Sequence, residues 1–169
     1  MTGPIPTTDP TLTLHPLTSA DAAALHDVLA ANRDHLSAQG DVFDQQLTLA
    51  ELEAKLAAKN RFDHWFVLVV DERIVGRMDL VDLGTRQAVF GYWLAADATG
   101  KGYVTAAGRA VIDHARALDV DEIYAGVAPG NTASERVLER LGFDLIQTLT
   151  DRTRWRLALI EPAPPPEMV

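Results

Sequence analysis

The spacing of hydrophobic residues in the first third of the chain changes from strand-like to helix-like. Leu12, Leu14 and Leu17 alternate with polar residues, which predicts a first strand. Apolar residues at 22, 25, 28 and 29 follow with helical spacing. The patterns Thr18-Ser19-Ala20-Asp21 and Thr48-Leu49-Ala50-Glu51 have the form of capping boxes, and the second predicts a helix to about residue 59. The polar residues 37–46 predict a loop.

The remaining pattern predicts three consecutive strands and then an alternation of helices and strands. The three strands are expected at 65–70, at 73–83 and in a stretch ending near residue 94. The later elements are a helix at 101–118, a strand at 122–127, a turn at 129–131, a helix at 132–141 ended by Gly142, and strands at 143–149 and 153–160. The order β-α-α-β-β-β-α-β-α-β-β predicts an α/β fold, a mixed sheet with helices on its faces. We expect disorder at 1–10, one domain over 11–161 and a proline-rich tail at 162–169.

Composition and charge narrow the class of protein. The chain has 169 residues, of which 47% are hydrophobic, enough for one domain with a core. No stretch approaches the ~20 apolar residues of a membrane span and no secretory leader is evident, so we expect a cytoplasmic protein that does not bind membranes. Zero cysteines exclude disulfides and thiolate chemistry, and the five histidines show no ligand spacing, so no metal is expected. The formal charge of −9 argues against a nucleic-acid partner and favours a cationic substrate such as an amine, or it only keeps the protein soluble.

A strand that runs into a glycine-punctuated turn and then into a helix is the most informative stretch of the chain. Gly100 and Gly102 stand in this turn and leave the backbone accessible. The backbone N–H groups and the positive end of the helix dipole converge there, which makes a seat for a phosphate or pyrophosphate. Ala95 and Gly102 break the Walker A pattern, and Thr105 breaks the dinucleotide fingerprint. A plain structural turn is the alternative.

Several motifs, in order over residues 12–160, resemble the GNAT superfamily of N-acetyltransferases. They are Gly91-Tyr92-Trp93-Leu94, Gly100-Lys101-Gly102-Tyr103, residues 127–134 and residues 137–143. Residues 14–21 and 32–36 are similar to the branch of this superfamily that acetylates the N-termini of ribosomal proteins. Because the motifs are linked and normally spaced, they are more specific together than the turn is alone.

The resemblance implies acetyl-coenzyme A (acetyl-CoA) as the cofactor, with its pantetheine arm in a cleft where two parallel strands splay apart. It implies that the backbone of Trp93 and Leu94 pairs with this arm, as an added strand would. It implies that the Asn131 side chain binds the arm near its thiol end, the alternative being an ordinary turn asparagine. It also implies that the pyrophosphate is held by the amides of Thr99, Gly100, Lys101, Gly102, Tyr103 and Val104.

The chemistry implied by the resemblance is direct attack of a neutral amine on the thioester. We assign stabilisation of the resulting oxyanion to the amide of Leu94. Ser134 matches the position that lies near the sulfur and protonates it, although an early-helix serine need have no such role. Tyr92 and Tyr103 are further candidate acids, or they only pack.

The general base is where the sequence departs most from the resembled family. Many relatives carry glutamates at the positions of Val89 and Ala106, and both are apolar here. Thr99 replaces the usual Gln or Arg, and Val104 replaces a smaller alanine. Four carboxylates remain as candidates for holding or deprotonating the amine, and each can equally be a solvated surface group: Asp41, Asp44, Asp79 and Asp82.

These observations predict an N-acetyltransferase that acts in a ternary complex on a primary amine. The amine is a protein N-terminal α-amine or a small basic molecule. Trp65 and Phe66 are candidates for the acceptor side of the cleft, although core packing is favoured for Phe66. The alternatives are a resistance enzyme that acetylates an amine antibiotic, a coenzyme-A sensor without turnover, and a nucleotide-binding regulator. A homodimer is a possible assembly.

Overall fold

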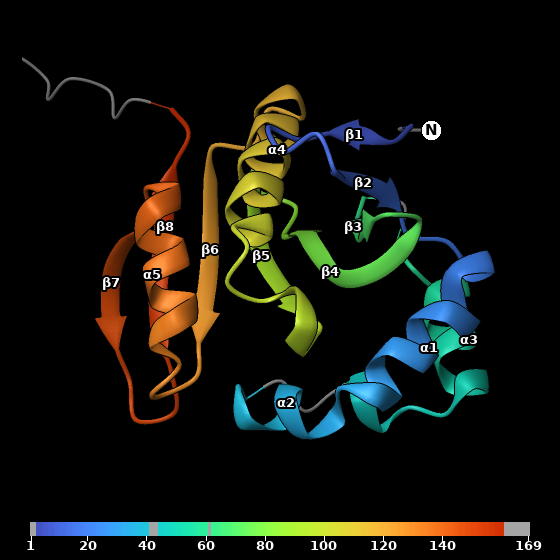
Figure 1. The fold of residues 1–169 in the computed structure, drawn as a ribbon. Coiled ribbons are helices and arrows are strands. Elements are labelled where there is room, and N and C mark those ends of the chain that lie inside the picture. The colour runs from blue at the N-terminus through green and yellow to red at the C-terminus, as the bar shows by residue number, and fades with distance from the viewer. Residues whose placement is uncertain (1–2, 41–43, 61, 161–169) are drawn as a thin grey trace, which may run out of the picture.

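The structure, a computed structural model, describes residues 3–40, 44–60 and 62–160, and it is built around one open sheet of eight strands (Figure 1). The strand order is β1-β2-β3-β4-β5-β6-β8-β7. Neighbouring strands are antiparallel, except that β5 and β6 are parallel because a helix crosses over between them. The strands are β1 (Ile5–Pro6), β2 (Leu12–Pro16), β3 (His64–Val70), β4 (Arg73–Asp82), β5 (Gln87–Leu94), β6 (Glu122–Val127), β7 (Asp144–Thr148) and β8 (Thr153–Ala158).

Helices lie on both faces of this sheet. In the described ranges the α-helices are α1 (Ala22–Ala31), α2 (Arg33–Ala38), α3 (Leu49–Ala57), α4 (Tyr103–Ala117) and α5 (Thr132–Leu141). Short 3-10 turns accompany them: η1 (Ser19–Asp21), η2 (Asp44–Gln46) and η3 (Ala96–Ala98). Helices α4 and α5 cover one face, whereas α1 and α3 cover the other (Figure 1). None of these helices is long and apolar enough to cross a membrane.

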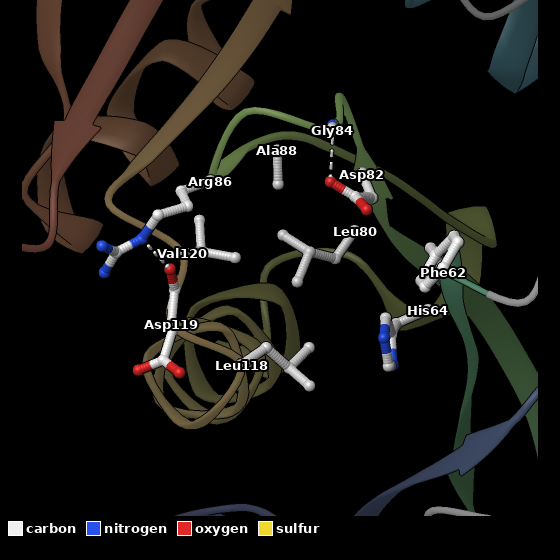
Figure 2. A pocket seen from close by; sticks show the side chains of 10 residues that line it. All are labelled: Phe62, His64, Leu80, Asp82, Gly84, Arg86, Ala88, Leu118, Asp119 and Val120. Atoms are coloured by element: carbon white, nitrogen blue, oxygen red, sulfur yellow. Dashed lines mark hydrogen bonds between the residues drawn. The ribbon is translucent and has the colours of Figure 1, made fainter.

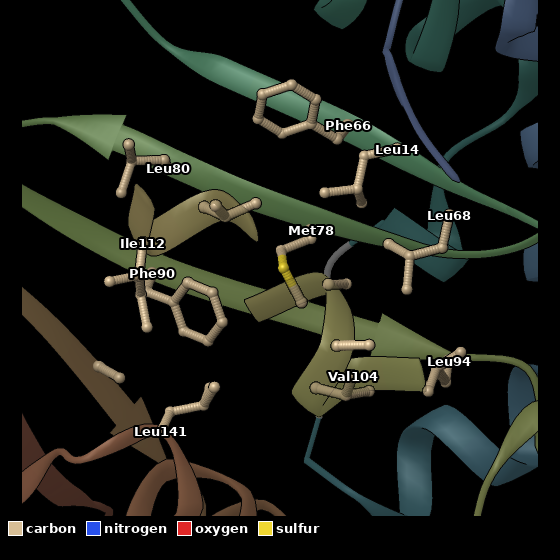
Figure 3. Packing of buried hydrophobic residues seen from close by; sticks show 14 of the residues in the cluster. Leu14, Phe66, Leu68, Met78, Leu80, Phe90, Leu94, Val104, Ile112 and Leu141 are labelled. Carbon is tan, nitrogen blue, oxygen red and sulfur yellow. The ribbon is translucent and has the colours of Figure 1, made fainter. Parts of the chain in front are cut away.

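Alternating residues of the central strands build a separate hydrophobic core on each face. Phe66, Met78 and Phe90 are at most 3% exposed and pack in the larger core beneath α4 (Figure 3). The next residue along β3, Val67, points to the opposite face and packs with Trp65 in the smaller core against α1 and α3. Removing these side chains from water is the main term that stabilises the fold. The core position expected for Phe66 is confirmed.

Helix caps lie where the sequence predicts them. The Thr48 amide donates to the Glu51 carboxylate at 2.8 Å and the Glu51 amide donates to Thr48 Oγ1 at 3.3 Å, so the capping box that opens α3 is complete. The Thr18–Asp21 box is also present, but it opens the short turn η1 ahead of α1. Gly142 ends α5 with a φ of 88°, a left-handed conformation that favours glycine.

Two expectations about the ends and loops differ from the structure. Residues 5–6, expected to be disordered, form β1 and pair with β2 in the register Ile5↔Leu14. Helix α2 occupies part of the segment expected to be a loop, and its sequence gives little helical pattern because Leu36 is its single buried residue. The expected tail at 162–169 lies outside the described residues.

The central feature is a split between β5 and β6. Only three residues of each strand pair, from Gln87↔Glu122 to Val89↔Tyr124. Beyond this point β5 continues to Leu94 and β6 to Val127 without pairing with each other. The predicted splayed sheet is therefore confirmed, and the unpaired edges of the two strands face one another across the split.

Candidate active site

The backbone of β5 presents every second residue to the split. The amide of Ala95 donates to the Val75 carbonyl of β4 at 2.8 Å, so the polar backbone groups of residue 95 face β4. Because these groups alternate between the two edges of a strand, those of Leu94 face the split and those of Trp93 face β4. The expectation that both residues offer backbone to a ligand is therefore corrected to Leu94 alone.

The glycine-rich turn brings a group of free amides to the N-terminus of α4. Gly100 and Gly102 have φ angles of 74° and 83°, a region in which glycine is unstrained. The amides of residues 100–105 donate to no acceptor within the described chain, and the first helical bond runs from the Ala106 amide to the Gly102 carbonyl. The Thr99 amide, expected among the free ones, instead donates to the Ala96 carbonyl at 3.3 Å. The free donors and the positive end of the helix dipole suit a pyrophosphate.

The turn opens into a cavity of about 400 Å³ between α4 and α5, and this cavity contains two arginines that sequence reasoning missed. Arg136 and Arg140 line it from α5 and form no ion pair with any described carboxylate. Residues four apart lie on the same side of a helix, so the two guanidinium groups share the face that borders the turn. The sequence signal that could have found them is their spacing of four residues in the helix predicted directly after the Asn131 turn. Together with the free amides they provide the positive potential that a coenzyme-A phosphate needs.

Two hydroxyl groups face each other in the lining of this cavity. The phenol of Tyr92 on β5 and the hydroxyl of Ser134 on α5 lie close to each other in its lining. Burial raises the pKa of Tyr92, and the nearby Ser134 hydroxyl acts in the opposite direction. Tyr92 therefore stays protonated at neutral pH and can give a proton to a strong base such as a thiolate. Tyr103, the other candidate acid, lines the same cavity at the start of α4, with the Lys101 ammonium 6.0 Å from its ring centre.

Asn131 acts as a structural cap in this arrangement. Its side-chain oxygen accepts from the Ser134 amide at 3.1 Å and so caps α5, while its Nδ2 donates to the Gln39 carbonyl at 3.1 Å. The side chain therefore ties the start of α5 to the end of α2. Its expected contact with the cofactor stays a prediction.

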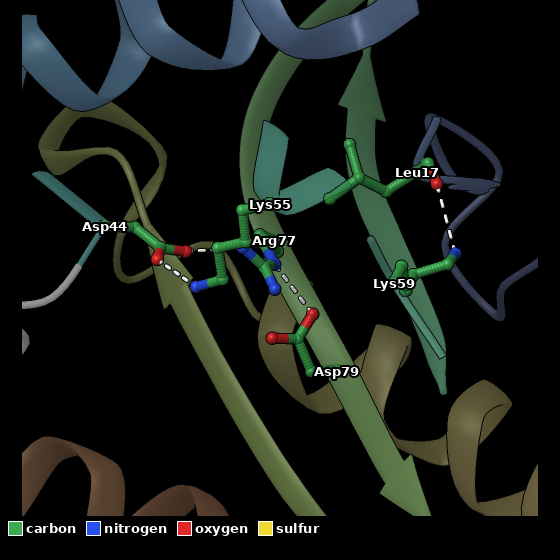
Figure 4. A network of polar contacts seen from close by, with 6 residues as sticks. All are labelled: Leu17, Asp44, Lys55, Lys59, Arg77 and Asp79. Atoms are coloured by element: carbon green, nitrogen blue, oxygen red, sulfur yellow. Dashed lines mark hydrogen bonds and ion pairs between the residues drawn. The ribbon is translucent and has the colours of Figure 1, made fainter. Parts of the chain in front are cut away.

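A second cavity, of about 550 Å³, opens on the other side of the split. Gln39, Tyr92 and Ser134 line both cavities, so the two spaces meet at the hydroxyl pair. One wall of the second cavity is a charged network from β4, η2 and α3 (Figure 4). Arg77 is 3% exposed and donates to Asp44 at 2.5 Å and to Asp79 at 2.8 Å. Lys55 also pairs with Asp44.

The structure separates the four candidate carboxylates. Asp44 and Asp79 lie in the charged wall of the second cavity. Asp82 lies at the opposite end of the sheet, where its carboxylate accepts from the Gly84 amide at 2.7 Å in another cavity (Figure 2). Asp41 lies outside the described residues. Only Asp44 and Asp79 are therefore placed in the wall of this cavity.

The remaining candidates take packing or lining positions. Trp65 is buried and stacks on the Arg77 guanidinium, which lies 4.5 Å from its ring centre, so its ring faces are not available to a substrate. Val89 is 36% exposed and lines the second cavity, whereas Ala106 packs in the core. Val104 is 8% exposed, packs in the core and borders the first cavity.

Comparison with known proteins agrees with this geometry. The acetyltransferase (GNAT) domain family matches residues 11–144. Probable N-acetyltransferase YjcK of Bacillus subtilis is 32% identical over 145 residues, which cover 79% of this chain and 80% of YjcK. Putative ribosomal N-acetyltransferase YdaF of Bacillus subtilis is 38% identical over 79 residues, which cover 45% of this chain and 43% of YdaF. The structure of Mycobacterium smegmatis RimJ in complex with a CoA-disulfide superimposes with a TM-score of 0.78 at 28% identity, over 93% of this chain and 86% of that one.

The predicted family, fold and cofactor are confirmed by these matches, and the free amides, the two arginines and the split fit acetyl-CoA. The chain belongs to the GNAT family of acetyltransferases and uses acetyl-CoA.

Proposed function

We propose that this chain transfers the acetyl group of acetyl-CoA to a primary amine with a low pKa, such as a protein N-terminal α-amine. The observation that carries the proposal is the meeting of two cavities at one hydroxyl pair inside the split. One cavity has the free amides and arginines suited to the donor, and the other is open to an acceptor. The two substrates therefore approach from opposite faces of the sheet and meet beside Tyr92 and Ser134.

On the donor side, the backbone provides most of the binding groups. The amides of residues 100–105 hold the pyrophosphate, and Arg136 and Arg140 add charge-assisted bonds to the phosphate groups. The edge of β5 beyond Val89 pairs with the pantetheine arm through Leu94 and the other residues that face the split. Coenzyme A supplies the thioester whose carbonyl carbon the amine attacks.

At the reacting end, the chain stabilises charge and supplies a proton. The Leu94 N–H points into the split, where it can donate to the carbonyl oxygen as negative charge develops on it. Tyr92 gives its proton to the leaving sulfur, and the nearby Ser134 hydroxyl helps to position the phenol. The burial that raises the pKa of Tyr92 keeps this proton in place until the thiolate forms.

The acceptor class follows from how readily the amine becomes neutral. At pH 7 about one α-amine in seven is uncharged, compared with about one lysine side chain in 2,500, given ordinary pKa values of about 7.8 and 10.4. The second cavity offers carboxylates and no histidine as a base among its described lining residues, so an amine that is already partly neutral is favoured. The similarity to a putative ribosomal N-acetyltransferase supports the same class.

The test is a screen for acetylated products by mass spectrometry, with free thiol measured in parallel. The purified chain is given acetyl-CoA and a panel of peptides with free α-amines, polyamines, aminoglycosides and aminoacyl nucleosides. We expect acetylated peptide and an equal amount of thiol. Coenzyme-A binding without any acetylated product would refute the proposal and favour a sensor.

A further inference from the structure

We propose that Asp79 and the open space at Gly91 form the seat of the acceptor amine, and that Asp79 accepts the proton which this amine must lose. The inference rests on the proposed acetyl transfer and adds the residues that receive the acceptor. Asp79 would be a catalytic residue, and Gly91 would determine which amines fit.

The space at Gly91 has no structural explanation within the fold. Gly91 pairs with Asp79 across β4 and β5, so both positions belong to the face opposite α4. A Cβ built on Gly91 meets no heavy atom within 4 Å, and its φ angle lies outside the left-handed region. Neither packing nor backbone conformation therefore requires glycine here. Because Gly91 has no side chain, there is room directly beside the Asp79 carboxylate in the wall of the second cavity.

Among the described residues, Asp79 keeps one carboxylate oxygen without a hydrogen-bond partner, whereas both oxygens of Asp44 have partners. Both oxygens of Asp44 are used, one by Lys55 and the other by Arg77. Asp79 Oδ1 accepts from Arg77 Nε at 2.8 Å, and its Oδ2 has no hydrogen-bond partner in the part of the chain that the structure describes (Figure 4). The Asp79 side chain is 23% exposed in the cavity, so a ligand can reach this oxygen.

The network around Asp79 fixes its position and makes it a better base. Arg77 cannot turn away, because it is stacked on Trp65 and bonded to Asp44. Burial raises the pKa of Asp79, although Arg77 beside it acts in the opposite direction. The other charged groups that act on the Asp79 carboxyl are Asp44, Lys55 and Lys59. A carboxylate with a raised pKa takes a proton from an ammonium more readily than an ordinary one does.

The proposed proton transfers balance as follows. The acceptor ammonium gives one proton to Asp79 Oδ2 and becomes a neutral amine. Its nitrogen forms a bond to the thioester carbon, the carbon–sulfur bond breaks, and Tyr92 protonates the sulfur. The new amide nitrogen loses its surplus proton, which restores Tyr92, and Asp79 releases its own proton to solvent. One ammonium and one thioester thus give one amide, one thiol and one proton.

The charge of the wall also selects the acceptor. Among its described residues, Asp44 and Asp79 carry two negative charges, and Arg77 and Lys55 carry two positive ones. Arg152, also in the lining, is paired with Asp151. A single ammonium can bind at the Asp79 oxygen, but a second ammonium on the same molecule finds no unpaired carboxylate in this wall. We therefore expect a monoamine to be acetylated in preference to a polyamine, despite the overall charge of −9.

The test uses Asp79→Asn and, as a matched control, Asp82→Asn at the far end of the sheet. The probes are a short peptide with a free α-amine and spermidine, and kcat and KM are measured for both substrates from pH 5 to 9. For Asp79→Asn we expect kcat/KM for the peptide to fall roughly 100-fold. The rising limb of its pH profile should move to higher pH, towards the pKa of the peptide amine, with the KM for acetyl-CoA unchanged and partial rescue by Asp79→Glu. Asp82→Asn should behave as wild type, and spermidine should be the poorer acceptor.

Gly91→Ala tests the seat without disturbing the charged network, because the new methyl group enters open space. It should raise the KM for the peptide roughly tenfold and leave the melting temperature and the KM for acetyl-CoA unchanged. Wild-type kinetics in both Asp79→Asn and Gly91→Ala would overturn the inference, as would spermidine being preferred to the peptide. Absence of acetyl transfer by the wild type to any amine would instead refute the proposed function.

Discussion

Replacing Gly102 by Asp and by Asn separates charge from shape at the proposed pyrophosphate seat. Gly102 has a φ of 83°, which Asn and Asp tolerate better than other side chains, and a Cβ there meets no atom within 4 Å. Both variants should therefore lose a similar stability, about 1 kcal/mol, from the left-handed backbone. They differ only in that Asp adds a negative charge beside the amides of residues 100–105.

The size of the charge effect can be worked out from Coulomb's law. For a carboxylate about 6 Å from a phosphate, an effective dielectric constant of about 20 to 40 gives a repulsion of roughly 1.4 to 2.8 kcal/mol per unit charge. Gly102→Asp should thus bind coenzyme A at least about tenfold more weakly than Gly102→Asn, since about 1.4 kcal/mol is a factor of ten. Isothermal titration calorimetry at low and high salt measures this, and the gap should narrow at high salt because the charges are screened. Equal affinities of the two variants at low salt would refute the assignment of this turn.

Other substitutions test the remaining parts of the site and the fold. Ser134→Ala should slow turnover several-fold and leave coenzyme-A affinity unchanged, because only the hydroxyl beside Tyr92 is lost; a wild-type rate would exclude Ser134 from the chemistry. Asn131→Ala should lower the free energy of unfolding by about 1 kcal/mol through loss of the α5 cap, measured by urea titration, and should raise the KM for acetyl-CoA if the predicted cofactor contact exists. Arg136→Ala and Arg140→Ala should each raise the KM for acetyl-CoA, most strongly at low salt, with little change in the KM of the amine. Burial lowers the pKa of His64 and of His114, whose ring nitrogens are 3.0 Å apart, so stability should be fully present above about pH 6.5 and fall as the pH drops below it; His114→Phe should weaken this dependence in urea titrations at several pH values.

Most of the fold was predictable because its signals are local. Alternation at Leu12 and Leu14 marks β2, and the Thr48–Glu51 box marks the start of α3, and both features depend on residues within a few positions of each other. The turn at Gly102 could be found for the same reason, since the strand, the glycines and the helix follow each other directly. Helix α2 was missed because a helix of six residues with one buried side chain, Leu36, has almost no periodicity to detect.

The acceptor side of the site was not predictable because its contacts are long-range. Arg77 joins Asp44, 33 positions earlier in the chain, to Asp79, and spacing along the sequence says nothing about such a meeting. The choice between Asp79 and the other carboxylates needed the register of β4 on β5, which sets Asp79 opposite Gly91. Register is fixed by the packing of both faces of the sheet, so a single sequence does not reveal it.

The short ladder between β5 and β6 has a mechanical consequence. Only three paired positions at one end of the strands join the two halves of the sheet. One half consists of β1 to β5 and the other of β6, β8 and β7. Acetyl-CoA bound along the unpaired edges of β5 and β6 would supply hydrogen bonds that the two strands do not make to each other, and so would hold the two halves of the sheet together. We therefore expect the liganded protein to resist pulling forces across this seam better than the free protein, and the donor to be the substrate that binds first.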